Sequence, residues 1–390
     1  MEGTMSENGL SPGVIGDSED FYTVTPCPRT ILLETTTRCN LQCAMCGAKA
    51  MHGRRPDMPE ALYQKILDDL APHHEQIESL MLFMDGEPLL DKRLPIFIRK
   101  AKEAGFSTVR IATNGMLLTG ATADAILYSG LDSLIVSIDS LDPRTYAEIR
   151  VGGDLNRVIQ NVKQFMALRE AKQRLRPQVE ARMIVMPQNQ AEQNEYRAFW
   201  RGIVDDVLFH GLHNWGNVEH LTPPCSTDAV RCNWPFRSMV IYSDGRAGFC
   251  CLDYEGIYPL GDFSHQSLNE IWHGEAYQKL RKHMARSDMQ FLTKCRKCNF
   301  ASLQPLTPQH WKKLLFLNST EDTCELFLEI SRRGALMRTS RYSLPAHKTF
   351  TWGLFYQNDI EHVTIFRNDN DFLTRVKINP IQTYYDIVIS

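Results

Sequence analysis

The chain has 390 residues, with 43 basic and 46 acidic side chains and a net charge of −3. This length is enough for two or three domains, and the balanced charge, without long runs of one sign, argues against a nucleic acid as an obligatory partner. The 11 cysteines occur in clusters with metal-like spacings in a large chain, which indicates metal sites in a reducing cytoplasm rather than a disulfide framework.

The first 27 residues are predicted to form a flexible leader. The segment up to residue 20 is rich in Gly, Ser, Glu and Asp and has neither a basic start nor an apolar run. A signal peptide and a membrane anchor are therefore not expected, and we predict a cytoplasmic protein without a membrane partner.

Short β-branched runs alternate with helical patterns between residues 28 and 210. This alternation predicts an α/β fold in which six βα units surround a parallel sheet. The strands are expected at 31–35, 79–84, 107–112, 133–138, 180–185 and 206–209. The helices are expected to begin near Pro59, Asp91, Thr119, Pro143, Asp154 and Ala191. Pro59 and Pro143 suit the first helical turn, where the missing proline N–H costs nothing.

Two further segments follow this core. Residues 211–304 are rich in His, Trp, Pro, Gly and Cys and form a second module. Residues 305–390 have almost no cysteine and form a β-rich tail of unassigned role, with strands predicted at 349–355, 362–366 and 384–389.

Three cysteines, Cys39, Cys43 and Cys46, follow the first predicted strand with the spacing C-x3-C-x2-C. A structural zinc or iron–sulfur site takes four protein ligands, whereas this trio has no fourth cysteine nearby. A four-iron cluster held here would keep one iron without a protein ligand, and that iron could bind a substrate. The alternative is a chance group of buried or zinc-binding cysteines.

The spacing and position of this trio resemble the signature of the radical SAM superfamily. In that superfamily the free iron of a 4Fe-4S cluster chelates the amino and carboxylate groups of S-adenosylmethionine. The resemblance covers about residues 28–302 and implies a partly open, TIM-like (β/α)6 barrel. In such barrels the reactive groups stand on loops at the carboxyl ends of the strands, which is where the cysteine loop is expected.

Several other residues match superfamily motifs and are expected to bind the cofactor. Gly86 and Glu87, in Asp-Gly-Glu-Pro after the second strand, resemble the Gly-Gly-Glu-Pro motif, and Asn114 stands in a frequent turn. Ser137 and Asp139 follow the fourth strand and resemble a segment that contacts the ribose or carboxylate. Asp139 could instead cap the next helix.

Arg150 resembles an arginine that pairs with the methionine carboxylate, a contact that suits the planar guanidinium. A surface ion pair is the alternative. Met45 stands where many members carry an aromatic residue near the adenine, and a thioether can pack there as well.

Four more cysteines, Cys232, Cys250, Cys295 and Cys298, supply a complete ligand set in the second module. Their spacing resembles the SPASM auxiliary-cluster domain in its shortened "twitch" form, which holds one 4Fe-4S cluster. A tetrathiolate zinc site is the alternative.

The remaining cysteines are Cys27, Cys225, Cys251 and Cys324. Cys251 adjoins a predicted cluster ligand and could donate a hydrogen atom to the substrate as a catalytic thiol, as in radical SAM epimerases; the alternative is a small buried hydrophobe. Cys225 could replace Cys232. His210, His213 and His220 could act as bases, although most histidines are expected to be structural.

The resemblance implies a radical SAM enzyme that forms a 5′-deoxyadenosyl radical and removes a substrate hydrogen atom. We expect oxidation or epimerisation of a biosynthetic substrate, either a sugar or cyclitol or a peptide, with a flavodoxin or ferredoxin as electron donor. One alternative is a peptide or sulfatase maturase. A second is a non-catalytic iron–sulfur or zinc-binding protein.

Overall fold

The computed structural model describes residues 22–51, 53–215, 232–288, 292–296 and 298–299. In the last segment of the chain it describes residues 311–320, 322–332, 335–346, 349–355, 360–367, 371–377 and 384–389. Most of the predicted leader therefore lies outside the described residues, as do Cys225 and His220.

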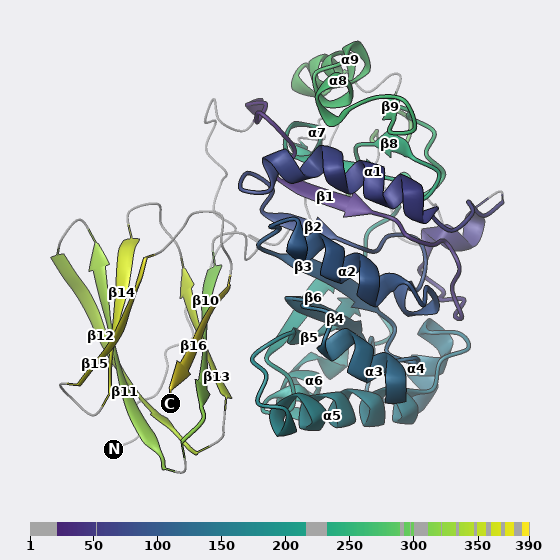
Figure 1. Cartoon of the computed structure of the whole chain (residues 1–390). Coiled ribbons are helices and arrows are strands. Elements are labelled where there is room, and N and C mark those ends of the chain that lie inside the picture. Colours follow the sequence, from purple (N-terminus) through teal and green to yellow (C-terminus); the bar gives the residue numbers. More distant parts are fainter. Residues whose placement is uncertain are drawn as a thin grey trace.

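A parallel sheet forms the centre of the first half of the chain (Figure 1). Its six strands are β1 (Thr30–Leu33), β2 (Ser79–Met81), β3 (Val109–Thr113), β4 (Ser133–Ser137), β5 (Gln178–Val185) and β6 (Asp206–Gly211). Neighbours in sequence are neighbours in the sheet, and every pair is parallel. Within the described residues, β6 and β1 do not pair with each other, so the sheet does not close into a full barrel. The predicted α/β partial barrel is confirmed.

One helix or helix pair follows each of the strands β1 to β5. The helices are α1 (Glu60–Leu70), α2 (Leu94–Glu103), α3 (Gly120–Leu127), α4 (Pro143–Ile149), α5 (Leu155–Ala171) and α6 (Gln193–Trp200). One-turn 3-10 helices span Gly47–Ala50, Ala71–His73, Pro88–Leu90 and Gln190–Glu192. Pro143 is the first residue of α4 as expected, whereas Pro59 stands one residue before α1, in extended conformation.

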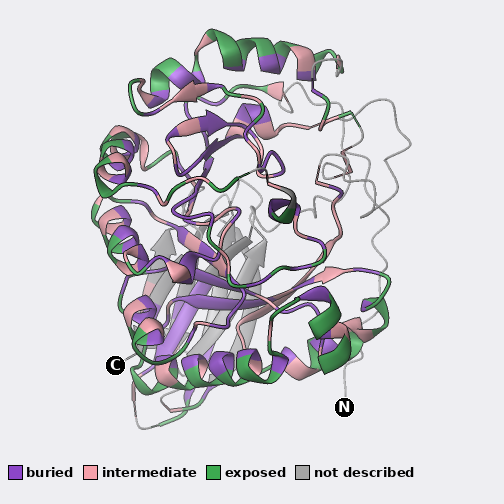
Figure 2. Ribbon diagram, turned by 90° about the vertical axis from the view of Figure 1, so that its right-hand side faces the viewer, coloured by how far each residue is buried: buried purple, intermediate pink, exposed green. Residues whose placement is uncertain are grey.

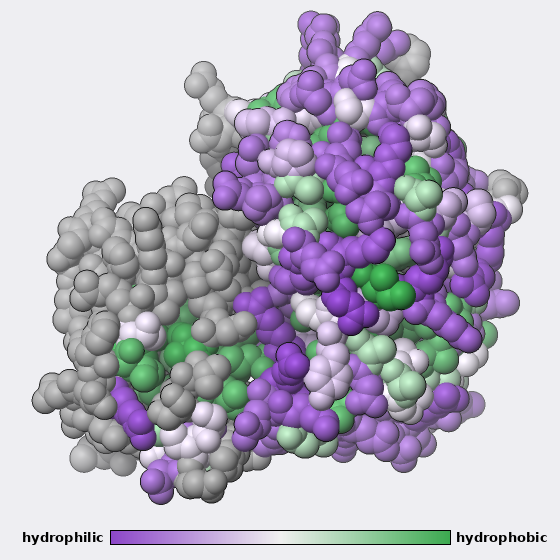
Figure 3. Space-filling view, in the orientation of Figure 1, coloured by the Kyte–Doolittle hydropathy of each residue, from purple (hydrophilic) through white to green (hydrophobic). Residues whose placement is uncertain are grey.

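The helices cover one face of the sheet, and their inner sides are buried while their outer sides are exposed (Figure 2). Because side chains alternate along a strand, Ile31 and Leu33 join the large core under the helices. Leu32 instead packs with Val240 and Tyr242 in a smaller apolar cluster on the opposite face. The outer surface over the helices is mainly hydrophilic (Figure 3).

The second module continues the barrel sheet rather than starting a separate one. Strand β7 (Ser238–Ile241) pairs parallel with β1, and β8 (Arg246–Gly248) and β9 (Gly261–Asp262) extend the sheet antiparallel. The helices of this module are α7 (Trp234–Arg237), α8 (Leu268–Trp272) and α9 (Glu275–Ala285), and Figure 1 shows α8 and α9 at the top of the molecule. This pairing brings the second cysteine group to the edge of the barrel, which the change in composition at residue 211 did not predict.

The tail contains strands in two further sheets. They are β10 (Trp311–Asn318), β11 (Cys324–Arg332), β12 (Ala335–Leu344), β13 (Thr349–Phe355), β14 (Ile360–Arg367), β15 (Asp371–Lys377) and β16 (Tyr384–Ile389). The sheet orders are β13-β10-β16 and β12-β11-β14-β15. Leu315 and Leu317 of β10 pack with Leu175, which precedes β5. Among the described residues, no helix combines the length and the apolar character needed to cross a membrane.

Candidate active site

The loop after β1 carries Cys39, Cys43 and Cys46 at the carboxyl end of the parallel strands. The three thiols lie within electrostatic reach of one another. Burial is the main cause that raises the pKa of Cys46 to about 11, and the neighbouring Cys43 and Cys39 contribute. Thiolates are the ligands that hold iron–sulfur clusters, and a cluster or metal that neutralised them would remove this mutual repulsion.

The loop after β2 lies directly on the cysteine loop. A Cβ atom on Gly86 would stand 2.3 Å from the carbonyl oxygen of Thr36 and 2.8 Å from that of Arg38. The next amide, of Glu87, donates to the carbonyl oxygen of Arg38 over 2.8 Å. Only glycine permits this approach of two backbones, so the motif residue Gly86 has a packing reason at the predicted site.

Glu87 is buried, and its carboxylate is hydrogen-bonded to groups of the protein. Its carboxylate accepts hydrogen bonds from the Thr113 hydroxyl (2.7 Å), the Asn114 amide (2.8 Å) and the Leu89 amide (3.1 Å). Burial raises its pKa. The Asn114 side chain in turn donates to Asn40 of the cysteine loop over 2.9 Å. Glu87 and Asn114 therefore connect the ends of β2 and β3 to the cysteine loop.

Arg150 and Asp139 form a buried ion pair beside the cysteine loop. The Arg150 Nε lies 2.5 Å from Asp139 Oδ2, and its Nη1 lies 3.6 Å from the sulfur of Cys43. The other oxygen of Asp139 accepts from the Ile184 amide over 2.7 Å. The alternatives of a surface ion pair and a helix cap are wrong: the pair is buried, and the cap of α4 is Asp142. Ser137 ends β4 and is half-buried.

The second group of cysteines also comes together. Burial raises the pKa of Cys295, and the neighbouring Cys250, Cys232 and Cys298 add to this shift. Within the described segments, no three His, Cys, Asp or Glu side chains are arranged to hold a single metal ion. In a cubane cluster each cysteine binds a different iron, so its ligands need not converge on one point.

Cys251 lies beside the small apolar cluster on the inner face of the sheet, which contains Leu32, Val240 and Tyr242. Its thiol shares a hydrogen bond with the sulfur of Cys250, which lowers the pKa of Cys250 and raises that of Cys251. The Cys251 side chain thus packs against the apolar cluster on the face of the sheet opposite to the helices.

Of the three candidate histidine bases, the structure describes His210 and His213, and both are buried enough to favour the uncharged form at neutral pH. Burial lowers the pKa of His210, on β6, to about 4 and that of His213 to about 4. His213 packs edge-on against Trp215, in accord with a structural role.

Two features of this region were missed from the sequence. The Trp215 indole donates to the carbonyl oxygen of Met45 over 2.6 Å, and its ring would lie 2.7 Å from a Cβ on Gly47. Trp215 therefore packs over the cysteine loop. One indication of this contact was present in the sequence, which is that Trp215 stands in a segment rich in cysteine and histidine.

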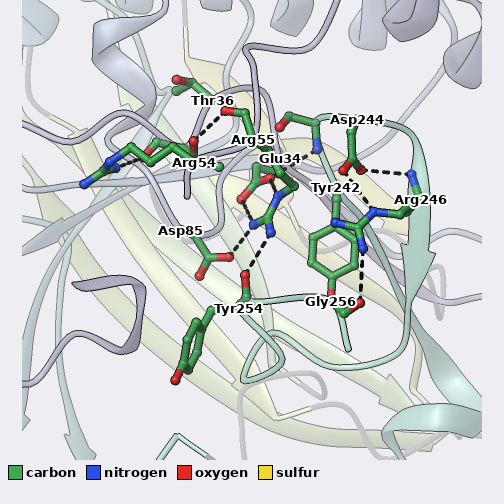
Figure 4. Close-up of polar contacts among 12 residues, drawn as sticks. Glu34, Thr36, Arg54, Arg55, Asp85, Tyr242, Asp244, Arg246, Tyr254 and Gly256 are labelled. Carbon is green, nitrogen blue, oxygen red and sulfur yellow. Dashed lines mark hydrogen bonds and ion pairs between the residues drawn. The ribbon is translucent and has the colours of Figure 1, made fainter. Parts of the chain in front are cut away.

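The second feature is a buried charge cluster of Glu34, Arg55 and Asp85, shown in Figure 4. Arg55 Nε lies 2.7 Å from Glu34 Oε2, and Arg55 Nη2 lies 2.9 Å from Asp85 Oδ2. The side chains of Glu34, Arg55 and Asp85 are 0%, 7% and 1% exposed, respectively. Burial, followed by the charge of Glu34, raises the pKa of Asp85 well above its ordinary value. Two carboxyl groups thus share one guanidinium next to the Gly86 loop.

Two protein-family models match the parts of the chain that contain the two cysteine groups. Residues 33–197 match the model of the radical SAM superfamily, and residues 232–299 match SPASM, an iron–sulfur cluster-binding domain. The first range contains the cysteine trio, and the second contains the four cysteines of the second module.

Curated relatives align over part of the chain. A tungsten-containing aldehyde ferredoxin oxidoreductase cofactor-modifying protein of Pyrococcus furiosus is 28% identical over 201 residues, 51% of this chain and 54% of that protein. A GTP 3′,8-cyclase of Limosilactobacillus fermentum is 33% identical over 149 residues, 37% of this chain and 44% of that protein. The chain thus spans about half the length of these curated relatives.

Solved structures share the fold. BtrN in complex with AdoMet and 2-DOIA superposes with a TM-score of 0.50 at 19% identity, over 72% of this chain and 96% of BtrN. Streptococcus suis SuiB bound to its precursor peptide SuiA superposes with a TM-score of 0.55 at 14% identity, over 67% of this chain and 68% of SuiB. Residues 33–197 thus belong to the radical SAM superfamily, and residues 232–299 form a SPASM iron–sulfur cluster-binding domain.

Proposed function

We propose that the chain binds a 4Fe-4S cluster through Cys39, Cys43 and Cys46 and uses it to cleave S-adenosylmethionine reductively. When bound, these cofactors supply a 5′-deoxyadenosyl radical, which removes a hydrogen atom from the substrate. The chain's own residues bind and orient the cofactor and exclude water from the barrel interior.

The observation that carries this proposal is the way in which the matching motifs meet. Gly86 lies against the backbone at Thr36 and Arg38, and Arg150 lies 3.6 Å from the Cys43 sulfur. Loops from separate strands thus surround the cysteine loop at one end of the barrel. The three cysteine thiolates fit a four-iron cluster in which one iron is left for S-adenosylmethionine. The N–H groups of Arg150 that do not bind Asp139 suit the carboxylate of S-adenosylmethionine.

We further propose that Cys232, Cys250, Cys295 and Cys298 hold one auxiliary 4Fe-4S cluster, which accepts an electron when the substrate is oxidised. The substrate would be a biosynthetic sugar or cyclitol, as the 2-DOIA complex of BtrN suggests, or a peptide, as the SuiA complex of SuiB suggests. A flavodoxin or ferredoxin would supply the first electron.

Anaerobic reconstitution and reduction, followed by measurement of 5′-deoxyadenosine, test this proposal. We expect formation of 5′-deoxyadenosine that depends on S-adenosylmethionine and on the reductant. A protein with a verified cluster that forms none would contradict it and favour a non-catalytic iron–sulfur protein.

A second outcome, epimerisation, is supported by the position of Cys251 at the inner face of the sheet. The thiol would return a hydrogen atom to the opposite face of the substrate radical and become a thiyl radical, which one electron from the flavodoxin or ferredoxin and one proton would convert back to the thiol. In deuterated solvent the wild type would label the inverted carbon, and Cys251→Ala would not. If the variant still introduced the label, another donor would be responsible.

A further inference from the structure

Arg55 lies where three segments of the chain meet. Its Nε and Nη2 donate to the two oxygens of Glu34, at the end of β1, over 2.7 and 2.9 Å. Its Nη2 also donates to Asp85, the residue before Gly86, over 2.9 Å. Its Nη1 donates to the carbonyl oxygen of Tyr254 over 2.9 Å. One guanidinium therefore contacts the barrel, the Gly86 loop and the SPASM module.

The contact with the SPASM module involves the turn that carries two of the cysteines discussed above. Tyr254 closely follows Cys250 and Cys251 in this turn. The Tyr242 hydroxyl donates to the carbonyl oxygen of Asp253 over 2.7 Å, and its ring stacks against the Arg55 guanidinium at 4.6 Å. Both the backbone and an aromatic ring of the module thus rest on Arg55, as Figure 4 shows for Tyr242 and Tyr254.

Glu34 supports the same junction from the barrel side. Its Oε2 accepts the Ser243 amide over 3.1 Å, so this carboxylate binds both Arg55 and the strand end after β7. Burial makes these interactions strong, and an unpaired carboxylate at this position would be costly. A lysine could not replace the arginine, since a single ammonium cannot present three directed donors in one plane.

We propose that Arg55 is a positioning residue that holds the loop 85–87 and the turn 250–254 in one fixed arrangement, and so sets the separation of the two cluster sites. Such placement matters for the chemistry, because misplacement of reacting groups by about 1 Å can cost about a hundredfold in rate. Arg55 acts through its neighbours and needs no contact with substrate.

This inference rests on the proposed assignment of the two cysteine groups as cluster sites. Its first test uses the anaerobically reconstituted full chain with both clusters reduced. Pulsed electron paramagnetic resonance then measures the magnetic interaction between the clusters and hence the distribution of their separation. We expect a narrow distribution for the wild type and a broader or shifted one for Arg55→Lys.

Arg93→Lys is the matched control. Arg93 also donates through two nitrogens to one carboxylate, that of Asp91, and to a backbone carbonyl, that of Met58, but both partners belong to the barrel. It should leave the distribution unchanged. Arg55→Lys also weakens the pairing of two buried carboxylates, which could destabilise the fold. The combined variant Arg55→Met/Glu34→Gln/Asp85→Asn removes the Arg55 interactions without leaving a buried charge. It too should broaden the distribution of the separation.

Hydrogen–deuterium exchange of the cluster-free protein provides the second readout, which does not depend on the cofactors. In Arg55→Lys the peptide containing Tyr254 should exchange about tenfold faster than in the wild type, because a charge-assisted hydrogen bond is lost. Arg93→Lys should not change it. Unchanged exchange in Arg55→Lys, or an unchanged cluster separation in both Arg55 variants, would overturn the inference. Failure of the wild type to assemble two clusters would contradict the proposed function, and the exchange measurement would still decide the role of Arg55.

Discussion

The two cysteine sites differ in how their parts are brought together. The cysteine trio stands on one loop, and the loops around it follow neighbouring parallel strands of the barrel. The second group comes from three separate segments, and Cys250 reaches the barrel only because β7 pairs with β1. Local spacing therefore determines the first site, whereas the second depends on tertiary contacts such as those of Arg55.

The largest expected effect separates the two sites directly. Cys43→Ala should abolish 5′-deoxyadenosine formation, because two cysteines would remain for the S-adenosylmethionine-binding cluster. Cys250→Ala should lose auxiliary iron but still form 5′-deoxyadenosine without substrate turnover. Iron and sulfide content and product analysis under anaerobic conditions check both. Loss of cleavage in Cys250→Ala, with the first cluster intact by spectroscopy, would show that the sites are not independent.

Gly86→Ala tests the close approach of the two loops at the first site. The added methyl group would stand 2.3 Å from the Thr36 carbonyl oxygen, and such overpacking destabilises by roughly 1–3 kcal/mol. We expect S-adenosylmethionine affinity to fall by about tenfold or more, the factor that corresponds to ~1.4 kcal/mol. Equilibrium binding to the reconstituted protein measures it.

The control for this change is Gly120→Ala, where nothing lies within 4 Å and the backbone φ is +50°. It should affect stability through backbone strain but leave the affinity near that of the wild type. An affinity unchanged in Gly86→Ala would contradict the assignment of this loop.

Arg150→Lys is expected to have a smaller effect. The lysine keeps the charge but loses the guanidinium contacts with Asp139 and the Cys43 sulfur. A hydrogen bond to a charged group contributes ~1.5–3 kcal/mol, and the lysine ammonium keeps part of this interaction, so the dissociation constant of S-adenosylmethionine should rise by less than about tenfold. Arg169→Lys, which alters a buried pair with Asp205 at the opposite end of the strands, should not change it. A similar loss in both variants would indicate general destabilisation.

The smallest effect concerns pH. Burial and then Glu34 raise the pKa of Asp85 well above its ordinary value of 3.8, so the folded protein binds a proton more tightly than the unfolded chain. Stability is therefore greatest below about pH 3.8 for this group and falls as pH rises through the raised pKa. Asp85→Asn should remove this fall, measured by denaturant unfolding at several pH values.

Asp142→Asn gives the opposite sign and serves as a control. The pKa of Asp142 is lowered by the hydrogen bond from the Thr145 amide. In the wild type the ionised Asp142 carboxylate adds to the free energy of unfolding above its ordinary pKa, and this addition is lost as the pH falls. Asp142→Asn should therefore lack this addition to the stability. A pH profile of Asp85→Asn that matches the wild type would show that Asp85 ionises normally.

The sequence predicted the βα units because each has a local pattern of apolar residues and turn residues. The cysteine trio and the Gly86 motif were predictable for the same reason, since their spacing lies within one loop each. Arg55 had no such signal: it stands in the polar loop Gly53–Pro56, and its partners Glu34, Asp85 and Tyr254 are far from it in sequence.

Contacts between segments far apart in the sequence explain the remaining differences. The sequence left open that Asp139 caps a helix and that Arg150 forms a surface ion pair, whereas the folded chain buries the two side chains as an ion pair with each other. The indole of Trp215 over Met45 likewise depends on the path of the chain after β6. Such contacts are set by which strand ends lie together in the sheet, and residue spacing does not contain that information.

The assignment of the first site requires that the cysteine trio hold a cluster with one iron open to S-adenosylmethionine. The most direct measurement is electron paramagnetic resonance of the reduced Cys250→Ala variant, which should retain only the first cluster, before and after addition of S-adenosylmethionine. The account predicts a 4Fe-4S signal that changes when the nucleotide binds. Absence of that cluster, or a signal unaffected by a saturating amount of the nucleotide, would contradict it.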